Sequence, residues 1–125
     1  MFTVDTMSRQ PIYEQLIQQL ENLVLSGLLK AGDQLPSVRS LSVELAVNPN
    51  TIQRAYSELE THGILCAVPG RGCFVAADAA LLLGQRARKR LEELDVLLKE
   101  LALAGVSEEE VTTRVRAVYQ KEGNP

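Results

Sequence analysis

One stretch of the chain, residues 48–63, carries signals for both ends of a helix. Asn48 is a favourable N-cap, and Pro49 suits the first helical position because an N–H there would have no helical partner. Gly63 can adopt the left-handed conformation that ends a helix, so we predict a helix from residue 49 to about residue 62. Its apolar residues fall on one side: Ile52, Ala55, Tyr56 and Leu59.

The opposite side of this helix is polar and carries Asn50, Gln53, Arg54 and Ser57. Asn and Gln can pair with adenine through two hydrogen bonds, and Arg can pair in the same way with the O6/N7 edge of guanine. A helix of this length fits a DNA major groove, so Asn50, Gln53 and Arg54 are candidates for reading base edges. The alternative is an ordinary solvated helix face.

A shorter helix is predicted directly before this one. Ser37 is a suitable N-cap, and Val38, Leu41 and Leu45 follow at helical spacing. Residues 46–47 leave room only for a tight link, so the two helices should form a helix-turn-helix. Arg39 lies in the first turn, where the helix dipole disfavours a cation unless an anion is near. A DNA phosphate would supply that anion, and a surface carboxylate is the alternative.

A β-hairpin is predicted after the helix-turn-helix. The β-prone runs 64–68 and 73–75 flank Pro69-Gly70-Arg71-Gly72, which is a strong turn signal. The two glycines let the backbone approach another surface closely, and Arg71 leaves one long cation at the tip. Such a tip suits a minor groove or a phosphate. A plain hairpin with a solvated Arg is the alternative.

Three ordered motifs lie within residues 32–75. Residues 32–41 read G-D-Q-L-P-S-V-R-S-L, residues 48–60 read N-P-N-T-I-Q-R-A-Y-S-E-L-E, and residues 70–75 read G-R-G-C-F-V. This segment resembles the DNA-binding domain of the GntR family of bacterial transcription regulators. The resemblance implies a winged helix-turn-helix and a sequence-specific DNA-binding regulator. We expect a repressor that binds an inverted-repeat operator as a homodimer. We also expect it in the cytoplasm, because no N-terminal apolar run resembles a signal peptide.

The resemblance also implies which residues contact DNA: Arg39, Asn50, Thr51, Gln53 and Gly70, with Arg54 and Arg71 as neighbours. One position departs from the pattern of some relatives, which place an Arg where this chain has Pro49. A base contact made in those proteins is therefore lost here, and the operator sequence should differ.

The fold is expected to be mainly α-helical. Pro11 and Gly27 bracket an amphipathic helix that should pack beneath the helix-turn-helix. Three helices and the hairpin wing should then form a DNA-binding domain over residues 1–76. A composition shift toward Ala, Leu, Glu, Lys and Arg follows, and it predicts a helical dimerisation tail over residues 77–125.

Within this tail we predict a long helix from Asp78 to about Ala104, and a capping box of Ser107 and Glu110 that starts a last helix. The long helix has apolar residues at heptad spacing: Ala87, Leu91, Leu94, Leu98 and Leu101. These residues need a partner helix, which favours a homodimer, and a closed helical hairpin in a monomer is the alternative. A short two-helix tail resembles the YtrA-like branch of the GntR family, and an effector stays unassigned.

The charge of the chain is acidic, with a net charge of −3 and a pI near 5.2. Neither part is basic, since residues 1–76 hold 5 Lys and Arg against 7 Asp and Glu, and the rest hold 8 against 9. Nucleic-acid-binding domains usually carry a basic stripe. The acidity therefore favours an alternative function, a winged-helix protein-protein interaction module without specific DNA binding.

Enzymatic, metal and membrane functions find little support. His62 is the single histidine, and no nucleophile motif, paired acid/base carboxylates or P-loop occurs. His62, Cys66 and Cys73 do not have the spacing of common zinc sites, so we expect no metal and no cofactor. Packed thiols are expected, with a wing disulfide or redox pair as the alternative. We expect no membrane span, because charges interrupt the apolar residues of the tail.

Overall fold

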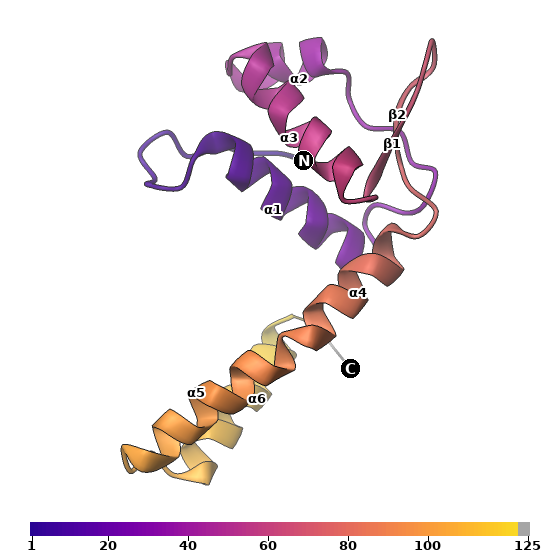
Figure 1. Cartoon of the computed structure of the whole chain (residues 1–125). Coiled ribbons are helices and arrows are strands. Elements are labelled where there is room, and N and C mark those ends of the chain that lie inside the picture. The colour runs from indigo at the N-terminus through magenta and orange to yellow at the C-terminus, as the bar shows by residue number, and fades with distance from the viewer. Residues whose placement is uncertain (123–125) are drawn as a thin grey trace. The chain divides into compact units, whose positions relative to one another are not determined.

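The computed structural model describes residues 1–122 and is mainly helical (Figure 1). The elements in chain order are α1 (Ile12–Leu25), α2 (Val38–Leu45), α3 (Pro49–Thr61), β1 (Leu65–Val68), β2 (Gly72–Val75), α4 (Ala79–Lys89), α5 (Leu91–Leu103) and α6 (Glu108–Lys121). The first three helices and the β1–β2 hairpin confirm the predicted winged helix-turn-helix. The last three residues of the predicted tail, 123–125, lie outside the described residues.

The ends of α2 and α3 have the predicted caps. The Asn48 side-chain oxygen accepts a hydrogen bond from the backbone N–H of Asn50 at 2.8 Å, and Pro49 is the first helical residue. The Ser37 hydroxyl accepts one from the N–H of Ser40 at 3.0 Å. Gly63, with φ at +79°, follows the end of α3. These local interactions determine where both helices of the motif begin and where α3 ends.

Helix α3 is the centre of the first unit. Its apolar side is buried, as predicted: Ile52, Ala55, Tyr56 and Leu59. It packs against α1, α2 and β1, and α1 contributes the buried side chains Leu16, Leu20 and Val24 to the same core. Phe2, from the segment before α1, is also part of this core.

The turn between α2 and α3 contains a non-glycine residue in the left-handed conformation. Ala46 has φ 55° and ψ 44°, and it is the single residue other than glycine with a positive φ within residues 1–122. The Ser42 hydroxyl donates a hydrogen bond to the Val47 carbonyl inside this turn. An L-residue in this conformation is strained because its Cβ approaches the following carbonyl oxygen.

The hairpin gains a third, strand-like segment that the sequence patterns do not predict. Residues 32–35 run alongside β2, where the Leu35 N–H donates to the Cys73 carbonyl and the Val75 N–H donates to the Asp33 carbonyl, both at 2.8 Å. The Gln34 side chain donates to the Arg71 carbonyl at 3.0 Å. The wing is therefore attached along β2 to the loop that leads into α2.

A second unpredicted interaction holds the segment before α1. The buried Gln15 carboxamide accepts from the Asp5 N–H at 2.8 Å and donates to the Asp5 carbonyl at 3.0 Å. The Gln19 carboxamide pairs with both backbone groups of Thr3 in the same way. These two side chains replace the partners that a neighbouring strand would provide.

The chain divides into two compact units, Met1–Arg86 and a second unit that begins at Ala87. The division differs from the boundary expected at Ala76, because Ala79 and Leu83 of α4 are buried in the core of the first unit. Arg86 also forms an ion pair with Glu21 of α1 at 2.7 Å.

The second unit consists of the end of α4 with α5 and α6. The prediction of one helix reaching Ala104 was wrong, because the chain forms α4 and α5 with a break at Arg90. Around Arg90, backbone hydrogen bonds join residues three apart, as in a 3₁₀-helix, instead of only four apart. The Arg90 N–H donates to the Ala87 carbonyl, and the Glu93 N–H donates to the Arg90 carbonyl, each at 3.0 Å. Ser107 caps α6 as predicted.

The apolar residues of the tail are poorly covered. Neither α5 nor α6 has a fully buried residue. Of the predicted seam, Leu98 and Leu101 are half-buried, whereas Ala87, Leu91 and Leu94 are exposed. Within residues 1–122, no helix is both long and apolar enough to cross a bilayer.

We predict that Ala46→Gly raises the free energy of unfolding by about 0.5–1 kcal/mol, because glycine adopts the left-handed conformation without strain. Urea unfolding of the full chain measures this change. The control is Ala80→Gly, an exposed position in the first turn of α4, where glycine relieves no left-handed strain and should not raise stability. A loss of stability in Ala46→Gly would show that the strain at this turn is negligible.

Candidate nucleic-acid interface

The outward side of α3 presents the predicted polar residues. Asn50 and Gln53 are exposed, and Thr51 is half-buried. The Gln53 amide donates to the Ser57 hydroxyl one turn further along at 3.0 Å. This contact between exposed groups is weak enough for a base edge to replace it.

A groove separates α3 from the wing, with a volume of about 480 Å³. Gln53 lines it from the helix, and Gly70 and Arg71 line it from the hairpin. Ser37 and Val38, from the start of α2, complete one wall. The structure thus brings together residues from all three sequence motifs along one groove.

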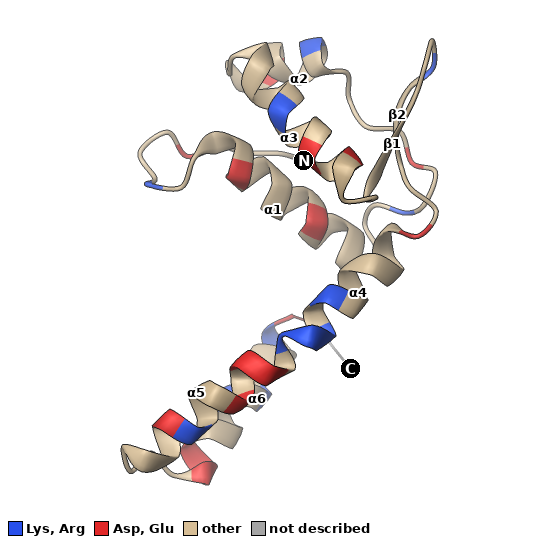
Figure 2. Ribbon diagram, in the orientation of Figure 1, with Lys and Arg blue, Asp and Glu red and all other residues tan. Residues whose placement is uncertain are grey.

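Two cations of this surface lack a carboxylate partner among the residues that the structure describes. Arg39 on α2 and Arg71 at the hairpin turn are exposed, and neither forms an ion pair within residues 1–122. Figure 2 shows basic segments on α2, on α3 and near the tip of the hairpin. The first turns of α2 and α3 contain no acidic residue. An acidic chain therefore still presents Arg39 and Arg71 beside a groove that Glu60 also lines.

Arg54 occupies a different place from Gln53, although the sequence groups them on one polar face. Its guanidinium carbon lies 3.6 Å from the centre of the Tyr13 ring of α1. Its Nε lies 3.7 Å from a Glu58 carboxylate oxygen. Arg54 thus lies on the side of α3 that faces α1, whereas Gln53 lines the groove beside the wing.

One functional contact was missed by sequence analysis. The Tyr56 hydroxyl, on the buried side of α3, donates to the Pro36 carbonyl at 2.8 Å. This bond ties α3 to the loop that carries Ser37 and leads to Arg39. No spacing rule signals it, because the partners are far apart in the sequence and one of them is a backbone group.

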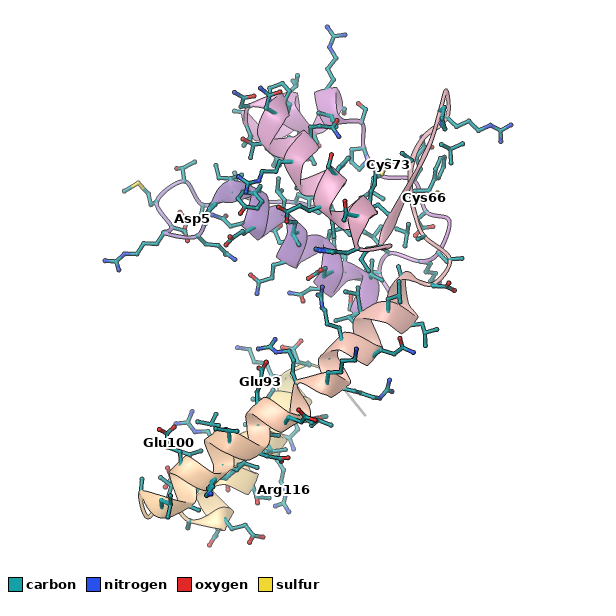
Figure 3. The ribbon with its side chains drawn as sticks, in the orientation of Figure 1. Asp5, Cys66, Cys73, Glu93, Glu100 and Arg116 are labelled. Carbon is teal, nitrogen blue, oxygen red and sulfur yellow. The ribbon has the colours of Figure 1, made fainter. Side chains whose placement is uncertain are left out.

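The two cysteines of the wing do not pair. Both thiols are free, and the strand register places Cys66 opposite Phe74 and Cys73 opposite Ala67. Since opposite residues share a face of the hairpin, this register puts the two thiols on different faces. Figure 3 labels both cysteines on the hairpin. Burial raises the pKa of the Cys73 thiol to about 11, and nearby Glu60 adds to the shift. Residues 1–122 contain no cluster of three or more His, Cys, Asp or Glu side chains that could hold a metal ion.

Comparison with known proteins decides the family. Residues 12–75 match the family described as "Bacterial regulatory proteins, gntR family". The chain is 39% identical over 119 residues to the HTH-type transcriptional repressor YtrA of Bacillus subtilis (strain 168). The aligned region covers 94% of this chain and 92% of that protein. This chain belongs to the GntR family.

Solved structures agree with this assignment. A transcriptional regulator from Oenococcus oeni matches with a TM-score of 0.73 and 31% identity, over 94% of this chain and 98% of that one. AraR(DBD) in complex with operator ORX1 matches with a TM-score of 0.53 and 26% identity, over 60% of this chain and 93% of that one. The protein is a DNA-binding transcription regulator with a winged-helix fold, and its family and relatives are regulators, not enzymes.

We predict that iodoacetamide alkylates Cys73 much more slowly than Cys66 near pH 8. Only the thiolate reacts, and Cys73 stays protonated until the pH approaches about 11, so its rate should keep rising over that range. Mass spectrometry of the folded chain measures both sites, and the urea-unfolded chain is the control, in which the two rates should converge. Equal rates in the folded chain would contradict the assignment of Cys73 to packing.

Proposed function

We propose that this GntR-family protein is a homodimeric repressor that binds an inverted-repeat operator through two copies of α3. The groove shared by α3 and the wing carries the proposal, because it places an exposed Gln53 beside Gly70 and Arg71. Asn50 and Gln53 are the base-reading residues. Arg39, Thr51, Gly70 and Arg71 contact the DNA backbone or the minor groove.

The tail supports dimerisation. A groove of about 410 Å³ runs along Ala87, Leu91, Leu94 and Leu97, with Arg90 and Glu93 at its edges. The side chains of Leu91, Leu94 and Leu97 keep 58%, 43% and 49% of their surface exposed. A partner helix seated here would cover them, while Leu98 and Leu101 supply the half-buried side of the same seam. Two monomers joined by twofold symmetry require a palindromic operator.

Repression is proposed from the relatives. YtrA of Bacillus subtilis is named a transcriptional repressor, and so is NagR of the same organism, which is 33% identical over 73 residues. Pro49 starts α3 with a side chain that offers no polar group to DNA, so specificity rests on the residues that follow it, Asn50 and Gln53.

The dimer is tested with Leu91→Glu, which places a charge in the apolar groove. We expect sedimentation to show a dimer for the parent at about 10 μM, the range for an interface of this kind, and a monomer for the variant. The matched control is Leu81→Glu, since Leu81 is an equally exposed leucine (58%) in the first unit. A monomeric parent, or a dimeric Leu91→Glu chain, would contradict a dimer interface on the tail.

Base readout is tested by selecting duplexes from a random pool with the parent and repeating the selection with two variants. The parent should select a palindrome. Gln53→Ala should cost about 1–3 kcal/mol and relax the preference at one position in each half-site. Arg39→Ala should weaken all sequences about equally and lower the salt slope of binding by about one per protomer. Equal affinity of the parent for palindromic and scrambled DNA would end this proposal.

A further inference from the structure

The contact between Arg54 and Tyr13 joins α3 to the first turn of α1. At 3.6 Å from the ring centre, the guanidinium lies on the aromatic face, the geometry of a cation–π interaction. The Tyr13 hydroxyl donates to the neighbouring Glu14 at 3.2 Å. The ring itself, and not the hydroxyl, is therefore the group that holds Arg54.

Arg54 keeps most of its hydrogen-bonding capacity in this position. The ion pair with Glu58, at 3.7 Å, is longer than a hydrogen bond, and the Arg54 side chain is 59% exposed. Stacking uses the face of the guanidinium and leaves the N–H groups at its edge for an outside acceptor. The Arg54 guanidinium, held on the Tyr13 ring, is already oriented, so it should lose little conformational entropy on binding an anion.

The position of Arg54 determines which anion it meets. A helix in the major groove has base edges in front of it and a phosphate backbone on each side. On the wing side of α3, Arg71 is the cation next to the groove that Gln53 lines. Arg54 lies about 100° further round the helix from Gln53, and its guanidinium is turned toward α1. With α3 in the major groove, a guanidinium held back on Tyr13 in this way would meet the second backbone instead of a base.

We propose that Arg54 is a phosphate contact and that Tyr13 is its positioning residue. This inference rests on the proposed binding of α3 in the major groove. It changes the role that the sequence suggests for Arg54, from a reader of guanine to a second fixed point on the DNA backbone. Specificity then depends on Asn50 and Gln53, and register depends on cations on both sides of α3.

The test compares Arg54→Ala with Gln53→Ala on the selected operator and on scrambled DNA, over a series of salt concentrations. We expect Arg54→Ala to weaken both duplexes by the same factor and to lower the salt slope by about one per protomer. Gln53→Ala should weaken only the operator and leave the slope unchanged. If Arg54→Ala relaxes the preference at one base position and keeps the slope, Arg54 is a base reader and the inference is wrong.

The positioning role is tested by Tyr13→Ala and Tyr13→Phe. Tyr13→Ala should weaken both duplexes by about two- to fivefold, the strength of an exposed cation–π contact, whereas Tyr13→Phe should bind like the parent because its ring remains. In an Arg54→Ala background, Tyr13→Ala should add no further loss. An equal loss in Tyr13→Phe, or additive losses in the double variant, would overturn the positioning role.

Two controls keep these outcomes separate from other failures. Thermal unfolding of each variant shows whether Tyr13→Ala disturbs the fold, and Tyr13→Leu, which retains apolar bulk without an aromatic face, should then reproduce the loss. The parent must prefer the operator over scrambled DNA. If the parent does not prefer the operator, the proposed function has failed. If the parent does prefer it but Arg54→Ala has the same salt slope as the parent, only this inference is refuted.

Discussion

Burial of one face of α3 is the interaction on which the rest of the first unit depends. Ile52, Ala55, Tyr56 and Leu59 are buried against α1, α2 and β1. Removing a large apolar side chain from water contributes about 1.5–3 kcal/mol. A rotation of α3 by one residue would expose several of them, whereas its outer face holds only a Gln53–Ser57 hydrogen bond and an exposed Arg54–Glu58 pair worth about 1 kcal/mol or less. Core packing therefore decides which side chains face outward.

The charges close to α3, and not the net charge, explain how an acidic protein can bind DNA. Interactions between exposed charges fade within about 8–10 Å at physiological salt, so the charges beside α3 matter more than the total of −3. Arg39 and Arg71 are free of carboxylate partners within residues 1–122. Few phosphate contacts imply weak nonspecific binding. In the proposed dimer, two half-sites engaged together would supply tight binding, and dimerisation would then be part of the recognition mechanism.

Sequence patterns predicted the elements that depend on local chemistry. The caps at Ser37 and Asn48, the end of α3 at Gly63 and the turn of the hairpin all involve residues within a few positions of one another. The mainly helical fold followed from the same rules. The outward placement of Asn50 and Gln53 followed from helical periodicity alone.

Features that depend on distant partners could not be predicted in this way. The Gln15 carboxamide that holds Asp5, the pairing of residues 32–35 with β2 and the stacking of Arg54 on Tyr13 each need the tertiary fold first. The break at Arg90 was missed because the composition on both sides favours a helix. Arg54 is at the edge of the polar face of α3, so its side chain could extend toward the wing or toward α1. The contact with Tyr13 of α1 directs it away from Gln53, and this contact exists only in the folded protein.

The central claim is that one face of α3 holds the core while the opposite face meets DNA. An NMR titration of the full chain with its selected operator tests this claim most directly, because side-chain amide signals report on single residues. We expect the side-chain NH₂ signals of Asn50 and Gln53 and the backbone signals of Gly70 and Arg71 to shift at a stoichiometry of one dimer per duplex. Unchanged signals at these four residues, with shifts confined to α5 and α6, would contradict the account.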